Sequence, residues 1–302
     1  MAGPKYITIT AEEANSKILS VLQNRLAEEV PRSALMKWIR TGQIRLDHKR
    51  TKPFRRVACG QTLRLPPQAQ IRSTSHAPSP QTDPLHRVAE TPDFLVVAKP
   101  AGLPMHPGSK HQTSLTQHIA RAYCHTPWPP QPVHRLDKDT SGLVLVAKRV
   151  EIFQELQKAW QQGEVGKYYL AWLLCREKSL PTRWQTWRDR VQAVHTAQGE
   201  KMDCVPQGGK EAVLHIRGMW SNANGTRLAL IQLETGRKHQ IRLQTASRGM
   251  AILGDSKYGQ GAEPKGLYLH AWRITFRGTE YRFAPPWTGP YSVTAEDLEY
   301  IV

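Results

Sequence analysis

The chain has 302 residues, enough for one large domain with a sizeable core and a second, smaller one. Its 42 Lys and Arg residues outnumber 25 Asp and Glu residues, and the formal net charge of +17 favours a polyanionic partner, nucleic acid before a membrane surface. No stretch comes near the roughly 18 consecutive apolar residues of a membrane span, and the N-terminal residues lack the apolar core of a signal peptide. We therefore expect a cytoplasmic protein with no membrane partner.

The residue types that usually bind metals are dispersed in this sequence. The four cysteines lie far apart without a C-x-x-C pair, which is typical of free thiols in a reducing compartment. The 12 histidines are scattered as well, and neither an H-E-x-x-H motif nor a mixed Cys/His cluster occurs. We predict no metal site.

Residues 8–65 are predicted to form a small N-terminal α/β domain. Apolar residues at helical spacing predict a helix within residues 11–26. A second helix is expected to open near residue 31, with Ser33 as a candidate N-cap and Gly42 as its end. Short strand signals follow at 44–46 and 62–65.

Basic residues dominate the second half of this predicted domain. Between residues 31 and 56 nine cations face a single acid, Asp47. Solubility alone would be served by mixed signs, so the imbalance indicates a surface that follows phosphates. The stretch resembles the small S-four-like RNA-binding domain in its pattern P-R-S-x(4)-W-I-R-x-G-x-I-R-L. The cations expected to bind RNA are Arg32, Lys37, Arg40, Lys49, Arg50 and Lys52.

A segment of linker composition separates this domain from the rest of the chain. Residues 66–87 are rich in Pro, Ser, Thr and Gln, and we place the boundary there. From 88 to 298 strand runs alternate with short helices, which predicts an α+β domain with a mixed, largely antiparallel sheet. Strands are expected at 94–98, 143–147, 167–174 and 226–233, and a helix near 150–163.

The run from His134 to Leu143 joins a cation, two carboxylates and a turn glycine just before an apolar strand. Its start fits a calcium loop, but the position that needs a bidentate carboxylate is Lys148, so that interpretation fails. Asp137 is then either a turn aspartate or a rigidly held carboxylate that a substrate can reach.

A second constellation runs from Thr235 to Gln244. Thr-Gly after the strand at 226–233 suggests a turn into a helix, with Lys238 and His239 in or near its first turn. On that helix His239 and Arg242 would share a face. Asp137 is an attractive partner for Arg242, because a buried carboxylate needs a cation to stay ionised. The alternative is a surface basic helix without a catalytic partner.

Two further features leave their roles open or point to structure. Tyr169 lies on the same strand face as Lys167 and Ala171, where it is either core or a stacking platform for a flipped base. Gly254 and Gly259 bracket a tight turn, in which we expect Asp255 to cap backbone amides.

At these residues the chain resembles the RluA-type pseudouridine synthases, which act on large-subunit rRNA and some tRNAs. Five motifs occur in the order of that family. They are 99–103 with 105–108, 134–143, 167–171, 235–242, and 252–259 with 269–271.

The resemblance implies a pseudouridine synthase fold, no cofactor and a set of roles. Asp137 would be the catalytic aspartate, Arg242 its partner, and Tyr169 would stack on the uracil. Arg135 would enter the space left by the flipped uridine. The substrate-binding set is then His134, Arg135, Lys167, Arg237 and His239.

The sequence thus predicts a monomeric RNA pseudouridine synthase that isomerises specific uridines in structured RNA, with 23S rRNA ahead of tRNA as substrate. A non-catalytic RNA-binding or ribosome-assembly protein is disfavoured, since Asp137, Tyr169 and Arg242 are all present. A methyltransferase would need a Gly-rich cofactor loop, which residues 99–102 do not form. Whether Asp137 attacks the anomeric carbon or acts as a base stays open.

Overall fold

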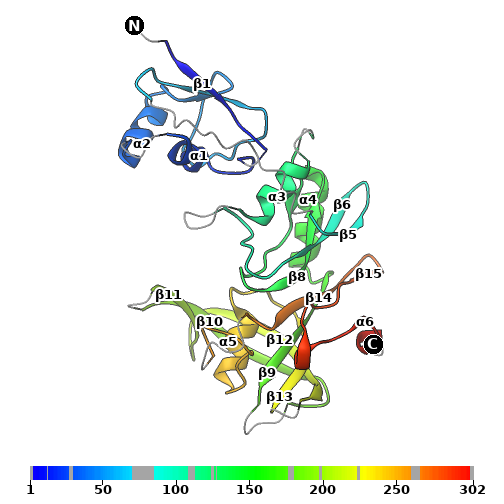
Figure 1. Ribbon diagram of the computed structural model, residues 1–302. Helices are drawn as coiled ribbons and strands as arrows, with labels where there is room; N and C mark the ends of the chain where they lie inside the picture. The colour runs from blue at the N-terminus through cyan, green and yellow to red at the C-terminus, as the bar shows by residue number, and fades with distance from the viewer. Residues whose placement is uncertain are drawn as a thin grey trace. The chain divides into compact units, whose positions relative to one another are not determined.

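The computed structural model describes residues 3–11, 13–26, 30–69, 85–107, 113–123, 126, 128–175, 180–196, 199–222, 225–259 and 266–299. The chain divides into two compact units, whose helices and strands are labelled in Figure 1. Unit 1 is Met1–Leu85, Pro104–Pro132 and Ala147–Val150, and unit 2 is His86–Leu103, Val133–Val146 and Glu151–Val302. Most of the linker expected at 66–87 lies outside the described residues, so the domain boundaries placed from the sequence stay predictions.

Unit 1 contains a small antiparallel sheet whose strands lie in the order β1-β4-β2-β3. The strands are β1 (Lys5–Thr8), β2 (Arg45–Leu46), β3 (Lys49–Arg50) and β4 (Thr62–Leu65). The helices are α1 (Ile18–Arg25), α2 (Arg32–Arg40) and α3 (Leu115–Ala122), and a short strand, β7, spans Gln131–Pro132. Ile18 and Leu22 of α1 and Leu35 of α2 join Leu63 of β4 in one buried cluster. The expected helices and strands are confirmed, although α1 starts later than its sequence pattern.

The expected N-cap of α2 is wrong. Pro31 is the N-cap, and no side chain caps the first turn. Proline suits this entrance because its φ is already near the helical value and it has no N–H to satisfy. Gly42 follows the helix with φ +75°, the left-handed conformation that glycine adopts readily, so its predicted role at the end of α2 is confirmed.

Unit 2 is built on a long sheet with the strand order β11-β10-β12-β13-β9-β14-β8-β6-β5, to which β15 adds beside β14. The pairs from β11 to β14 are antiparallel, whereas β14 and β8 run parallel, so the expected mixed, largely antiparallel sheet is confirmed. The strands are β5 (Arg87–Glu90), β6 (Phe94–Lys99), β8 (Ser141–Ala147), β9 (Gly166–Leu174), β10 (Gln185–Thr196), β11 (Gly199–Cys204), β12 (Lys210–Ser221), β13 (Thr226–Leu233), β14 (Leu269–Phe276) and β15 (Thr279–Arg282). The helices are α4 (Val150–Gln161), α5 (Gln240–Ser247) and α6 (Ala295–Glu299), with a 3₁₀ turn at Gly289–Tyr291.

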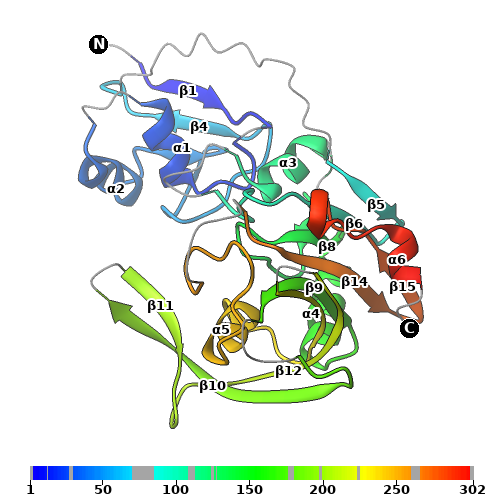
Figure 2. The same cartoon turned by 60° about the horizontal axis from the view of Figure 1, so that its bottom comes forward.

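The strands β10, β11 and β12 have no counterpart among the strands expected from the sequence. Each of β10 and β12 has 12 residues, and β10 pairs with both of its neighbours. Figure 2 shows α5 beside the curved part of the sheet that these strands form. Leu243 of α5 packs there against Val191 of β10 and Ala212 of β12, so these two strands support the helix that carries Arg242.

The end of the loop that bears Asp137 is held tightly at the start of β8. Gly142 has φ +113°, and a Cβ placed on it would lie 2.2 Å from the carbonyl oxygen of Ala271, which explains why a glycine stands there. The neighbouring Ser141 Oγ lies 2.8 Å from Nδ1 of the buried His270, whose Nε2 lies 2.8 Å from the carbonyl oxygen of Phe283. The loop therefore has a rigid attachment to β14.

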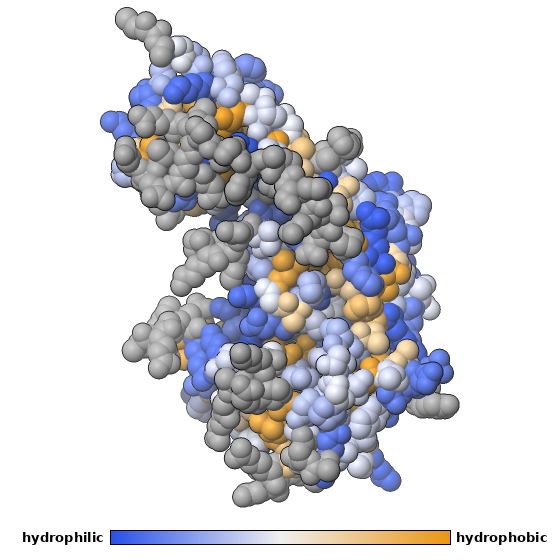
Figure 3. All heavy atoms as spheres, in the orientation of Figure 1, coloured by the Kyte–Doolittle hydropathy of each residue, from blue (hydrophilic) through white to orange (hydrophobic). Residues whose placement is uncertain are grey.

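On the face shown in Figure 3, apolar side chains appear as separate small patches among hydrophilic ones. Among the described residues, no helix has the length and apolar character needed to cross a membrane.

Candidate active site

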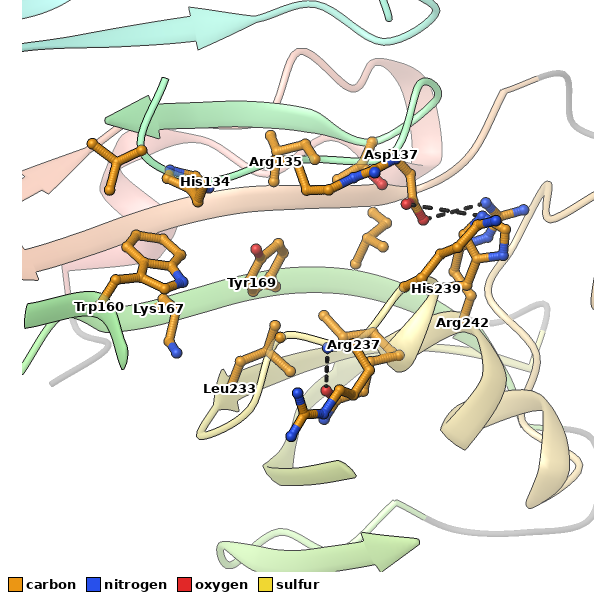
Figure 4. Close-up of a pocket in the computed structure, with 18 residues that line it drawn as sticks. His134, Arg135, Asp137, Trp160, Lys167, Tyr169, Leu233, Arg237, His239 and Arg242 are labelled. Carbon is orange, nitrogen blue, oxygen red and sulfur yellow. Dashed lines mark hydrogen bonds and ion pairs between the residues drawn. The ribbon is translucent and has the colours of Figure 1, made fainter. Parts of the chain in front are cut away.

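A cavity of about 230 Å³ opens in unit 2 where segments far apart in the sequence meet. Its lining comes from the loop 133–140, from Trp160 of α4, from β9 and from the turn and first part of α5 (Figure 4). Of the residues expected to form the site, eight line this cavity. They are His134, Arg135, Asp137, Lys167, Tyr169, Arg237, His239 and Arg242.

Asp137 and Arg242 meet at one side of the cavity although 105 residues separate them. Nη1 of Arg242 lies 3.4 Å from Oδ2 of Asp137, and Nε2 of His239 lies 3.9 Å from Oδ1. The Asp137 side chain is 16% exposed, so a small ligand in the cavity can reach it. The pairing of Asp137 with Arg242 expected from the sequence is therefore present.

The stronger partner of Arg242 is Asp255, for which the sequence predicted only a capping role. Nε and Nη2 of Arg242 donate to the two carboxylate oxygens of Asp255 at 2.9 and 2.8 Å, in the bidentate geometry that arginine favours. Asp255 also accepts the backbone N–H groups of Lys257 and Tyr258, which confirms its capping role.

Burial and mutual attraction have opposite effects on the pKa values of Arg242 and Asp255. Burial alone would raise the pKa of Asp255 and lower that of Arg242. The hydrogen bonds and attraction between the two groups outweigh burial, so the pKa of Asp255 lies below its ordinary value and that of Arg242 above. Both groups are ionised, and Arg242 is a fixed positive charge beside Asp137.

Lys99 holds the backbone behind Asp137. Its side chain is almost fully buried, and Nζ donates to the carbonyl oxygens of Pro100, Leu103 and Lys138 at 2.8–2.9 Å. Burial lowers the pKa of Lys99 to about 8, against the opposing attraction of Asp139 and Asp137. From the sequence, Lys99 belongs to a motif but has no predicted role. Its three partners are backbone carbonyl oxygens, and no pattern of side chains reveals such partners.

Tyr169 lies in the middle of β9 with its ring on the cavity wall (Figure 4). The residue is 8% exposed, and burial, then the charge of Asp137, raises the pKa of its phenol. It stays a neutral phenol at physiological pH. The ring is thus part of the core and of the cavity lining at once.

The wall of the cavity on the side away from Asp137 is formed by His134, Trp160 and Lys167 (Figure 4). The imidazole of His134 stacks on the indole of Trp160 with 4.0 Å between ring centroids, and its Nε2 accepts the N–H of Leu145 at 3.0 Å. Burial, and then the charge of Lys167, lowers the pKa of His134 to about 3, so the ring is neutral. Lys167 is 5% exposed and its Nζ donates to the carbonyl oxygen of Glu234 at 3.1 Å. His134 and Lys167, which were expected to bind substrate, therefore also have partners within the protein.

Arg135 and Arg237 are exposed cations of the cavity lining. Arg237 is steadied by a hydrogen bond from Nε to the carbonyl oxygen of Glu211 at 2.8 Å. The turn before α5 is in turn fixed by the buried Gln240, whose Oε1 accepts the backbone N–H of Arg237 at 2.9 Å and whose Nε2 donates to the carbonyl oxygen of Val213.

The structure places the start of α5 just after Lys238 and His239. The helix begins at Gln240, and His239 is its N-cap in the left-handed conformation, with φ 57°. The position of His239 just outside the helix still directs its ring to Asp137, as Figure 4 shows.

The basic residues expected to bind RNA in the N-terminal domain belong to unit 1. Lys37 and Arg40 of α2, Lys49 and Arg50 of β3, and the following Lys52 are all exposed. The side chain of Arg32 lies outside the described residues. A surface groove of about 550 Å³ is lined by residues that include Lys37, Arg40 and Lys52. Across the part of the chain that the structure describes, no three His, Cys, Asp or Glu side chains gather as a metal ion would need.

Comparisons with known proteins identify the class to which this fold and cavity belong. A family model described as RNA pseudouridylate synthase matches residues 93–247, which include every residue lining the cavity except Leu269. Solved structures of two human RNA pseudouridylate synthase domain-containing proteins, 1 and 4, share the fold, with TM-scores of 0.56 and 0.55 at 21% and 22% identity. They cover 70% and 67% of this chain, and the matches span 87% and 88% of those chains.

Two bacterial proteins are similar over most of the chain. The ribosomal large subunit pseudouridine synthase C of Escherichia coli K12 is 31% identical, over 90% of this chain and 88% of that protein. The ribosomal large subunit pseudouridine synthase D of Haemophilus influenzae is 33% identical, over 85% of this chain and 79% of that protein. The chain belongs to the RNA pseudouridylate synthase family and is an isomerase of that class.

Proposed function

We propose that this protein isomerises specific uridines in the RNA of the large ribosomal subunit, with Asp137 as the catalytic carboxylate. The observation that carries the proposal is the position of Asp137 on the cavity, 3.4 Å from an arginine that Asp255 holds in place. The names of the relatives support the choice of RNA, since both are synthases of the ribosomal large subunit. We further propose that the protein acts in the cytoplasm as a monomer.

The reaction needs the functional groups that this cavity contains. The bond between uracil N1 and the sugar C1′ breaks, the ring rotates, and C5 bonds to C1′. C5 then loses its proton and N1 gains one, so atoms and electrons balance without an oxidant or a cofactor. Asp137 serves either as nucleophile at C1′ or as base at C2′, and both roles require an ionised carboxylate. Arg242 forms an ion pair with this carboxylate at 3.4 Å.

The remaining lining residues fit the handling of a flipped nucleotide. Removal of a uridine from its stack costs roughly a few kcal/mol, and the exposed Arg135 can occupy the space that the base leaves. Tyr169 supplies a ring face for the uracil, where stacking on an aromatic side chain is worth about 1–3 kcal/mol per base. Arg237 and His239 line the cavity and are assigned to contacts with the phosphates and sugar, while His134 and Lys167 shape the wall.

We propose that residues 8–65 form an S-four-like RNA-binding domain. Their exposed cations Lys37, Arg40, Lys49, Arg50 and Lys52, together with Arg32, bind phosphates without reading sequence. A second binding surface of this kind supports a large structured RNA as substrate, and hence rRNA ahead of tRNA.

The test is the release of tritium from RNA that carries uridine tritiated at carbon 5. Wild-type protein should release tritium from large-subunit rRNA and not from tRNA transcripts. The Asp137→Asn variant should bind rRNA with unchanged affinity and release none. Asp139→Asn is the matched control, because Asp139 is an exposed carboxylate on the same loop. Tritium release by Asp137→Asn at the wild-type rate would remove Asp137 from the mechanism, and release from tRNA alone would replace rRNA as substrate.

A further inference from the structure

His239 and Tyr258 form a hydrogen-bonded pair beside Asp137. The hydroxyl of Tyr258 lies 2.9 Å from Nδ1 of His239, and the two rings meet edge to face with 5.6 Å between centroids. His239 keeps the left-handed backbone conformation, which costs free energy for a residue with a Cβ and persists where the surroundings hold it. The pair is therefore built into the site.

The hydrogen bonds of Tyr258 determine which nitrogen of His239 carries the proton. The Tyr258 oxygen accepts the backbone N–H of Met202 in β11 at 3.2 Å, so its own proton is available to a second acceptor. Nδ1 of His239, 2.9 Å away, is within reach to be that acceptor. In a neutral imidazole only one nitrogen accepts, and Nε2 must then carry the proton.

The environment of His239 keeps the ring neutral. Burial lowers its pKa; the attraction of Asp137 opposes this, and the charges of Arg242, Lys257 and Lys238 add to the lowering. The neutral Nε2–H faces Oδ1 of Asp137 at 3.9 Å, while Arg242 lies at Oδ2. A shift of about 1 Å would close this distance to a hydrogen bond, as often happens when a catalytic site binds its substrate.

We propose that His239 is a positioning residue for Asp137: the hydroxyl of Tyr258 fixes the imidazole as the Nε2–H tautomer, and this N–H orients the carboxylate toward the ribose. The inference rests on the proposed function of Asp137. Arg242 supplies the charge, and His239 supplies a neutral donor that restricts rotation of the carboxylate without taking up its negative charge. The backbone N–H of Met202, in the hairpin of β10 and β11, holds the Tyr258 oxygen in place.

A matched pair of variants separates the donor from the bulk of the side chain. Gln places an amide N–H close to the position of the imidazole Nε2, whereas Met has similar length and no donor. Neither is β-branched, so both meet the left-handed backbone at similar cost. In single-turnover assays with saturating rRNA we expect His239→Met to lose about tenfold or more in rate, and His239→Gln to keep most of it. Titrations of rRNA binding, run beside the rate assay, separate any loss of affinity from the loss of rate.

Tyr258→Phe tests the origin of the tautomer, since it keeps the ring and removes the hydroxyl. Its rate should fall in the wild-type background and should not fall further in the His239→Met background. Nitrogen-15 NMR of histidine-labelled protein should show Nε2–H for His239 in the wild type and a mixture of tautomers in Tyr258→Phe. This second measurement does not depend on activity, so it stands even if the protein modifies no rRNA.

Three results would overturn the proposal. They are equal rates for the Gln and Met variants, independent losses in the double variant, and a wild-type spectrum with the proton on Nδ1. An absence of tritium release by the wild type would instead reject the proposed function. Thermal unfolding of each variant shows whether a lower rate reflects a damaged structure.

Discussion

Replacing Asp255 by Asn removes the carboxylate that holds Arg242, with little change in the size of the side chain. In the wild type the guanidinium of Arg242 donates two hydrogen bonds to Asp255, and both side chains are almost fully buried. The variant leaves a buried cation with Asp137 as its remaining close carboxylate, at 3.4 Å. We therefore expect decreases in both stability and activity.

The size of the effect follows from the burial of the pair. Removing one partner of a buried ion pair costs about 3–5 kcal/mol, because the other charge is left uncompensated. Asn keeps an oxygen that can accept one of the Arg242 or backbone N–H groups, so we expect the lower end, about 3 kcal/mol. For a cooperative unit of roughly 150–250 residues, the range in which unit 2 falls, that corresponds to a fall in melting temperature of about 6–12 °C.

The pH dependence of the difference in stability between the wild type and Asp255→Asn gives a sharper test. The pKa of Asp255 is lowered below its ordinary value of 3.8 in the folded state. Its contribution to stability is then fully present above that value and is lost as the pH falls through the lower, folded pKa. The free energies of unfolding of wild type and Asp255→Asn should therefore differ at pH 7 and converge toward pH 3.

Urea unfolding at both pH values, together with single-turnover tritium release at pH 7, measures these quantities. The matched control is Asp203→Asn, because Asp203 is an exposed carboxylate that accepts a hydrogen bond from the adjacent backbone N–H of Cys204. Equal stability of Asp255→Asn and Asp203→Asn would refute the view that Asp255 anchors Arg242. A destabilised Asp255→Asn with full activity would show that the anchor does not serve catalysis.

Two further predictions concern other parts of the molecule. Burial lowers the pKa of His270 from 6.5 to about 4, so the unfolded chain binds this proton first and stability should fall by about 3 kcal/mol as the pH drops from 6.5 to 4. Urea midpoints across that range should show a shallower decline for His270→Gln, and an unchanged slope would contradict the assignment. In unit 1, replacing Lys37, Arg40 and Lys52 together by Ala should reduce the salt dependence of rRNA binding by about 0.7–0.9 in log–log slope for each phosphate that the variant no longer neutralises. The single-turnover rate at saturating RNA should not change, and an unaltered slope in a filter-binding titration would exclude these residues from the RNA-binding surface.

Much of the local structure follows from patterns that neighbouring residues create. Apolar runs predicted the strands at 94–98 and 226–233, and the structure has β6 at Phe94–Lys99 and β13 at Thr226–Leu233. β10 and β12 were not expected, since their charged and polar residues obscure the alternation and pairing within the sheet is what makes them strands.

The candidate site also has features that the sequence predicted and features that only the structure revealed. The sequence by itself determined which motifs carry chemically reactive side chains, and so it pointed to Asp137 with Arg242 and to the ring of Tyr169. Only the tertiary structure decided the partners of buried charges. It paired Arg242 with Asp255 and surrounded Lys99 with three carbonyl oxygens. A buried charge must be compensated by whichever group the fold brings within about 3 Å, and the spacing of residues along the chain does not specify that group.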